Sequence, residues 1–176
     1  PPVVTGTPDR SWTAYEARNP VGSYVTVFNA SDISAHNWIL EFEAVSSAFY
    51  VWVNGQKVGY SQNSMSPAEF DISRYLKEGE NLLAVEVYRW CDGSYIEDQD
   101  FWRLSGIFRS VKLWKRPLLH ISDYRISLIP SADFGSAAFN VDVQLANTAR
   151  KKSDEMSVRV SLKGNNADGK EVDQIL

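Results

Sequence analysis

Hydrophobic and polar residues alternate along most of the chain beyond its first twenty residues. A period of two is typical of β-strands that bury one face, so residues 23–28 and 38–43 are predicted to be strands. Residues 48–60 contain two further segments of this kind, which flank Asn54-Gly55. Because Asn-Gly supplies the two positive φ angles of a type I′ turn, we predict a tight β-hairpin there.

The same pattern predicts the strands that follow. Residues 70–72 indicate a short strand leading into one helical turn at 73–76, and residues 82–88 indicate a central strand. After a polar loop at 91–105, residues 107–114 alternate again. Short strands with no long helical pattern between them favour an antiparallel jelly roll or sandwich.

The pattern is interrupted at residues 115–117, where two charges and a proline suit a linker. Three more alternating segments follow, at residues 120–128, 137–145 and 156–162. Three strands cannot close a sandwich of about seven. The predicted fold class is therefore all-β: an antiparallel jelly-roll β-sandwich over residues 1–117, then a partial immunoglobulin-like β-sandwich over residues 118–176.

Composition and charge exclude several classes of function. The formal net charge of -4 offers no basic surface for a phosphate backbone, so nucleic acid is not an expected partner. No apolar tract approaches the roughly 18 residues of a membrane span. Cys91 is the only cysteine, which excludes an internal disulfide and leaves the cellular compartment open. We expect Cys91 to be a small buried hydrophobe.

Aromatic residues make up 12% of the chain, which favours a β-rich fold or an aromatic-lined site. Four tryptophans lie in strand patterns or at their edges and are predicted core residues: Trp38, Trp52, Trp90 and Trp114. Trp102 and Arg103 lie in the polar loop, where we expect them to pack in a seam between domains. The alternatives are that Trp102 stacks on the apolar face of a sugar and that Arg103 anchors the loop through a carboxylate.

Two stretches carry more specific information than the strand pattern. The first comprises residues 49–60, 70–73 and 79–85. The second, residues 89–109, contains Asp-Gly-Ser-Tyr, Glu-Asp-Gln-Asp and Trp-Arg-Leu-Ser-Gly-Ile-Phe-Arg in that order. Together with residues 19–24, these stretches resemble the N-terminal jelly-roll domain of the large β-galactosidases of glycoside hydrolase family 2, over about residues 19–116.

The resemblance implies a part of a larger enzyme. In that family the catalytic carboxylates lie on a TIM barrel after the jelly roll and the immunoglobulin-like domain, and nothing in this sequence resembles the barrel. The chain opens at Pro1-Pro2, without an initiator methionine or a signal peptide. We therefore expect a non-catalytic segment of a homo-oligomeric β-galactosidase, with a jelly roll that lacks its first strands. Its expected partners are the β-galactoside substrate and the barrel of the same parent chain.

The resemblance also implies roles for three residues. Asp100 matches an aspartate that reaches into the barrel's active site, meets a galactose hydroxyl and helps to hold a sodium ion. A carboxylate suits both tasks, because it accepts strong hydrogen bonds and is a hard oxygen ligand. Gln62 and Asp92 match positions that join other residues around a magnesium ion in some members. Two oxygen donors make a weak site, so ordinary loop hydrogen bonding is the expected role of this pair.

Glu97, Asp98 and Asp100 are the acidic residues that could be considered for catalysis. Retaining glycosidases need two carboxyl groups on opposite sides of the glycosidic bond, about 5 Å apart. Neighbours in one loop do not flank a sugar ring from two sides, so the fragment alone is expected to be inactive. Two alternatives stay open, a free carbohydrate-binding module and a purely structural β-sandwich, because jelly rolls host all three functions.

Overall fold

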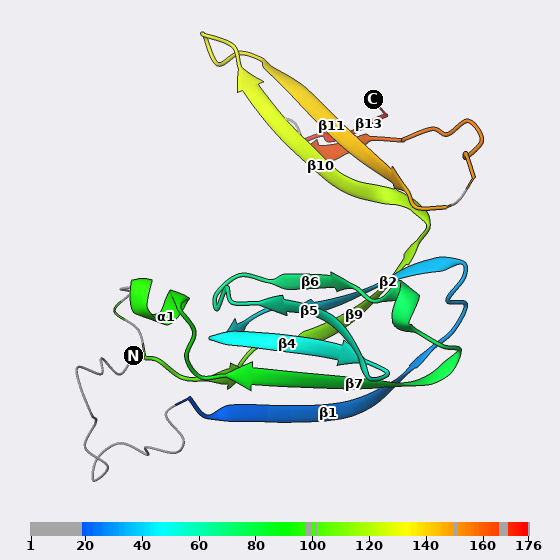
Figure 1. Ribbon diagram of the computed structural model, residues 1–176. Coiled ribbons are helices and arrows are strands. Elements are labelled where there is room, and N and C mark those ends of the chain that lie inside the picture. The colour runs from blue at the N-terminus through cyan, green and yellow to red at the C-terminus, as the bar shows by residue number, and fades with distance from the viewer. Residues whose placement is uncertain (1–18, 98–99, 101, 150, 166–168, 176) are drawn as a thin grey trace. The chain divides into compact units, whose positions relative to one another are not determined.

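The computed structural model describes residues 19–97, 100, 102–149, 151–165 and 169–175 (Figure 1). The chain divides into two compact units, Pro1–Pro117 (unit 1) and Leu118–Leu176 (unit 2). Every strand pair that the structure describes is antiparallel, so the predicted all-β class is confirmed. No helix in the described ranges is long and apolar enough to cross a membrane.

Unit 1 is a sandwich built mainly of two antiparallel sheets. The four-stranded sheet has the order β1 (Val21–Ala30), β7 (Gly79–Tyr88), β4 (Ala48–Val53) and β5 (Gln56–Ser61). The three-stranded sheet has the order β6 (Ala68–Asp71), β2 (His36–Phe42) and β9 (Val111–Pro117). Two short strands, β3 (Val45–Ser46) and β8 (Gly106–Ile107), pair beside them.

The core of unit 1 lies between the two sheets, where the apolar faces of alternating strands meet. Phe42 on β2 and Phe49 on β4 are each 1% exposed, and their ring centroids are 4.8 Å apart. Trp38 is buried in this core, as predicted, but Trp114 is 42% exposed. Trp114 pairs with Ile39, which lies on the face of β2 opposite to the buried face, so the core prediction was wrong for this residue. The remaining two predicted core tryptophans, Trp52 and Trp90, are only partly buried.

The predicted hairpin between β4 and β5 is confirmed, with Asn54 at φ 51° and Gly55 at φ 78°. The Asn54 side chain also ties this turn to its surroundings. Its Nδ2 donates to Asn81 Oδ1 at 2.7 Å and to the Tyr75 carbonyl at 2.9 Å. The hairpin is thereby fixed to the start of β7 and to the 3₁₀ turn η2 (Ser73–Tyr75), which was predicted as one helical turn.

Two predictions for unit 1 were wrong near its end. Residues 107–114 form the end of β8 and the start of β9 rather than one strand, with a break at 108–110. Residues 115–117 are not a linker, because they extend β9 and pair with β2. Their charges do not end the strand, since the Lys115 ammonium forms an ion pair with the Asp32 carboxylate at 2.7 Å.

Unit 2 consists of two hairpins, β10 (Leu119–Pro130) with β11 (Ala137–Asn147) and β12 (Ser161–Asn165) with β13 (Glu171–Ile175). The first two predicted segments are confirmed as strands. The third prediction was wrong over residues 156–160, which form no strand, and β13 was not predicted. None of the unit 2 residues whose burial is described is buried. The assignment of unit 2 to half of an immunoglobulin-like sandwich stays a prediction.

Candidate functional site

The connection from β7 to β8 carries most of the predicted site residues. It begins with α1 (Gly93–Ile96), one helical turn within a stretch that the sequence pattern predicted as a polar loop. The turn is held locally: Ser94 Oγ accepts from the Cys91 amide at 3.1 Å, and the Glu97 amide donates to the Gly93 carbonyl at 2.9 Å. Ser94 is buried, whereas Cys91 is only partly buried and not the buried hydrophobe that was expected.

Asp100 lies beyond α1 in the same connection and is exposed. No described residue donates a hydrogen bond to its carboxylate or forms an ion pair with it. The carboxylate can therefore accept hydrogen bonds from the hydroxyls of a ligand or coordinate a small cation. Glu97 is described and partly buried, but Asp98 lies outside the described residues, so the three acids have no described common geometry.

The structure brings Gln62 and Asp92 toward the same tyrosine. The Tyr60 hydroxyl donates to Gln62 Oε1 at 2.8 Å. Burial raises the pKa of Tyr60, and the nearby Cys91 and Asp92 charges raise it further. The Asp92 carboxylate accepts from the Gly93 amide at 3.0 Å.

These contacts do not amount to a magnesium site. Mg²⁺ prefers octahedral coordination by about six oxygen ligands, and Gln62 and Asp92 supply two side chains that already accept hydrogen bonds. Within the described ranges no group of three or more His, Cys, Asp or Glu side chains could hold a metal ion. The described residues therefore do not fit this ion by themselves.

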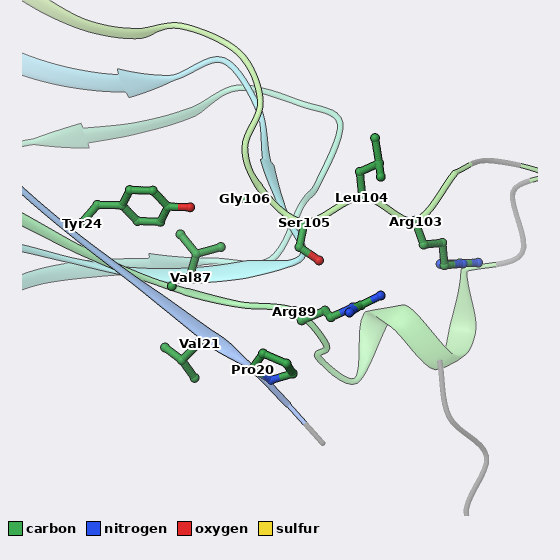
Figure 2. Close-up of a pocket in the computed structure, with 10 residues that line it drawn as sticks. Pro20, Val21, Tyr24, Val87, Arg89, Arg103, Leu104, Ser105 and Gly106 are labelled. Carbon is green, nitrogen blue, oxygen red and sulfur yellow. The ribbon is translucent and has the colours of Figure 1, made fainter. Parts of the chain in front are cut away.

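A hollow of about 430 Å³ opens between β1, the end of β7 and the segment before β8. Figure 2 shows apolar side chains, Val21 and Val87, along one part of it and polar side chains, Arg89, Arg103 and Ser105, along the other. The sequence pattern did not single out this hollow, because its parts are about 80 residues apart in sequence and meet only through the pairing of β1 with β7.

The two arginines of this hollow are held by different contacts. Arg103 Nη2 donates to the Glu97 carbonyl at 2.9 Å, which anchors the connection through the main chain. The Arg89 guanidinium lies 5.2 Å from the centroid of the Trp90 ring, within cation–π range. Trp102, beside Arg103, is 89% exposed, so its predicted packing against another domain stays a prediction.

A second hollow, of about 270 Å³, is lined by the rings of Tyr50, Tyr60, Tyr88 and Trp90 and by Asp92. The Tyr50 and Tyr60 ring centroids are 4.7 Å apart. The Asn54-Gly55 turn was the available signal for this cluster, because the register of the hairpin pairs Tyr50 with Tyr60. We call this site the aromatic hollow.

The sequence matches the family model described as "Glycosyl hydrolases family 2, sugar binding domain" over residues 10–117. The matched region therefore lies entirely within unit 1 and covers all of it except residues 1–9.

Curated relatives agree with this match. The chain is 45% identical over 150 residues to a β-galactosidase of Priestia megaterium, a match that covers 85% of this chain and 14% of the relative. It is 51% identical over 128 residues to a β-galactosidase of Clostridium acetobutylicum, which covers 72% of this chain and 14% of the relative. The chain thus spans about one seventh of the length of these relatives.

Solved structures share the fold. A β-glucuronidase of Bacteroides uniformis superimposes with a TM-score of 0.67 at 20% identity, covering 89% of this chain and 20% of that one. A β-glucuronidase of an uncultured Clostridium superimposes with a TM-score of 0.64 at 21% identity, covering 92% and 30%. The antiparallel sandwich, the family match and the identity to curated relatives agree, and the chain belongs to glycoside hydrolase family 2, whose sugar-binding domain it contains.

Proposed function

We propose that this chain is a non-catalytic part of a β-galactosidase and that unit 1 supplies Asp100 to a substrate site completed by a catalytic barrel elsewhere in the same protein. The observation that carries the proposal is the exposed Asp100 carboxylate, which has no partner among the described residues although the connection around it is anchored at α1 and at Arg103. The β-galactosidase relatives, at 45–51% identity, support the choice of substrate.

In this role Asp100 binds and positions substrate. An ionised carboxylate accepts a charge-assisted hydrogen bond from a galactose hydroxyl and offers one hard oxygen ligand to a sodium ion. The ion, when bound, would supply a fixed positive charge beside the sugar hydroxyls. Contacts away from the reacting bond accelerate the reaction only when they are stronger in the transition state than in the ground state.

The expectation that the chain alone is inactive rests on Glu97 and Asp100, which lie in one connection, because neighbours in one loop do not flank a glycosidic bond from two sides. The direct test is an assay of the purified chain and of the full-length protein with a chromogenic β-galactoside. We expect turnover by the full-length protein, which we propose to be a homo-oligomer, and none by the chain alone. Turnover by the chain that survives repurification and disappears in Asp100→Ala would overturn the proposal.

The aromatic hollow favours a second candidate function, that of a carbohydrate-binding module. Aromatic rings pack against the C–H faces of sugars, and the Asp92 carboxylate, which also lines the hollow, can accept hydrogen bonds from sugar hydroxyls. Titration of the chain with D-galactose, followed by NMR of the tryptophan side chains, tests this function. Binding should be lost in Trp90→Ala and kept in Trp114→Ala, because Trp114 lies on the other sheet.

A further inference from the structure

We propose that the hollow lined by Arg89 and Arg103, which we call the arginine hollow, is a binding site for a carboxylate group. Such binding would be a property of unit 1 itself and needs no galactosidase activity. It is also separate from the Asp100 carboxylate, whose negative charge suits hydroxyl donors and cations rather than anions.

Charge is the first reason. The described residues form ion pairs through four cations, Lys112, Lys115, Arg116 and Lys163. Neither Arg89 nor Arg103 is among them, although the chain has a net charge of -4 and carboxylates are in excess. Two guanidinium groups on one hollow repel each other, and an anion placed between them removes that repulsion.

Preorganisation is the second reason. The Arg103 side chain is held by the Glu97 carbonyl at 2.9 Å, and the Arg89 guanidinium lies over the Trp90 ring. Each guanidinium carries five N–H donors, and these contacts use only one N–H of Arg103 and the face of Arg89. On each arginine, two of the remaining N–H groups can therefore donate side by side to the two oxygens of a carboxylate, in bidentate geometry.

The carboxylate of Glu97 does not take this place. Glu97 lines the smaller hollow that adjoins the arginine hollow, together with both arginines. Its main-chain carbonyl, however, is the group that accepts the hydrogen bond from Arg103, and no ion pair joins its carboxylate to either arginine. No carboxylate of the described residues therefore neutralises the two arginines, and the carboxylate of a ligand can do so.

The walls of the hollow indicate the kind of anion. Val21, Val87 and Leu104 give it an apolar part, while the Ser105 hydroxyl adds a polar group beside the arginines (Figure 2). A volume of about 430 Å³ exceeds what a carboxylate alone would fill. The ligand is thus a carboxylate on an organic body, which is either a free organic acid or an Asp or Glu side chain from protein outside these 176 residues.

Two sugars that differ at one group provide the test. The chain is titrated with D-galacturonate and, separately, with D-galactose, and the arginine Nε–Hε signals are followed by ¹H–¹⁵N NMR. We expect galacturonate to shift the Arg89 and Arg103 signals in a saturable manner and galactose to leave the Arg103 signal unchanged. Equal responses of Arg103 to the acid and to the neutral sugar would overturn the proposal.

Single substitutions of the arginines test whether galacturonate binds at the arginine hollow. Arg103→Gln and Arg89→Gln should each weaken galacturonate binding by about tenfold or more, because each removes a charge-assisted contact. Arg103→Lys should give an intermediate loss, since it keeps the charge and removes the bidentate fork. Arg74→Gln is the matched control, because Arg74 lies on η2 against the Tyr75 ring and should not matter. Wild-type affinity in both glutamine variants would contradict the site.

The two sources of the carboxylate are separated in the full-length protein. If a free acid is the ligand, galacturonate shifts the same arginine signals there. If a side chain of the protein is the ligand, those signals are already shifted, galacturonate leaves them unchanged, and Arg103→Gln destabilises the full-length protein more than the 176-residue chain. Arginine signals that match those of the ligand-free chain and ignore galacturonate would count against both sources.

Discussion

Units 1 and 2 are built from the same kind of alternating strand, yet among the residues whose burial is described only those of unit 1 form a buried core. In unit 1 the apolar face of β2 meets that of β4, and Phe42 and Phe49 are 1% exposed. In unit 2, β10 pairs with β11 so that Ile126 opposes Val141 and Leu128 opposes Phe139 on one face. Ile126 remains 56% and Leu128 65% exposed.

The difference shows that alternation defines a face but does not bury it. Opposed side chains on a two-stranded ribbon contact each other, whereas removal from water requires a second layer. Unit 1 has that layer in its three-stranded sheet. No residue of unit 2 whose burial is described is buried, so the exposed face of β10 and β11 has no such layer among the described residues. The assignment of unit 2 to half of a sandwich stays a prediction.

The largest difference in the loss of unfolding free energy is expected when one leucine in each unit is replaced by alanine. Leu40→Ala in unit 1 should cost about 2–5 kcal/mol of unfolding free energy, because Leu40 is 2% exposed and its loss leaves a cavity. Leu128→Ala in unit 2 should cost less than about 1 kcal/mol. All six tryptophans precede residue 118, so tryptophan fluorescence in urea reports unit 1, and amide hydrogen exchange in β10 and β11 reports unit 2.

The Leu128→Ala variant also tests the expectation that unit 2 is half of a sandwich. In the full-length protein a second layer should cover β10 and β11, and Leu128→Ala should then cost as much as a core leucine. An unchanged small cost there would contradict the half-sandwich assignment.

The second-largest difference in unfolding free energy is expected when an asparagine in each unit is replaced by alanine. Asn81 is 1% exposed, and its side chain bonds to Lys77, Gly79 and Asn54. Asn81→Ala should therefore cost about 2–3 kcal/mol, because buried donors and acceptors lose their partners. Asn147→Ala is the control in unit 2, where an exposed amide can exchange its partners for water and the cost should stay below about 1 kcal/mol. Equal losses in urea unfolding and hydrogen exchange would show that burial is not the cause.

Two glycines provide a steric comparison. A Cβ at Gly59 on β5 would lie 2.6 Å from Phe70 Cε1, so Gly59→Ala should force the ring to move and cost about 1–2 kcal/mol. A Cβ at Gly164 on β12 meets nothing within 4 Å, so Gly164→Ala should be neutral or slightly stabilising. The thermal midpoint of each unit tests both variants. A harmless Gly59→Ala would mean that Phe70 is free to shift.

The smallest expected effect is the loss of unfolding free energy at acidic pH. The Lys112 ammonium donates to the Glu43 carboxylate and holds the pKa of Glu43 below its ordinary value of 4.5. A lowered pKa in the folded state means that the contribution is complete above the ordinary pKa and is lost as the pH falls through the lowered value. In unit 2 the pKa of Asp133 is lowered only by contacts within its own turn, to Ser131 and Gly135.

Glu43→Gln should therefore reduce the acid-induced loss of stability in unit 1, whereas Asp133→Asn should leave unit 1 unchanged. The measurement is urea unfolding by tryptophan fluorescence at neutral pH and below pH 4. The same acid-induced loss in wild type and Glu43→Gln would show that the Lys112 contact does not link the strands.

Most strands of unit 1 could be predicted from the sequence, because the period of two and the Asn54-Gly55 turn are local signals. The exposure of Trp114 could not be predicted, since it depends on which face of β9 meets the other sheet. The extension of β9 through residues 115–117 depends on distant carboxylates such as Asp32.

The residues of the candidate sites likewise include some that the sequence identified and some that only the structure revealed. Asp100, Gln62 and Asp92 were found through a resemblance carried by local motifs. The arginine hollow and the aromatic hollow were not found, because residues far apart in sequence meet there through strand pairing. Local patterns therefore identified single residues, and the fold was needed to group side chains into sites.

The role of Asp100 is tested most directly by the kinetics of Asp100→Asn in the full-length protein at several sodium concentrations. The substitution keeps the volume and removes the charge, so the hydrogen bond to substrate loses about 1.5–3 kcal/mol, or one to two decades in kcat/KM. Sodium activation should weaken in the same variant, while Asp142→Asn, an exposed aspartate of unit 2, should retain wild-type values. Wild-type kinetics with a wild-type response to sodium in Asp100→Asn would contradict the proposed role of unit 1 in the substrate site.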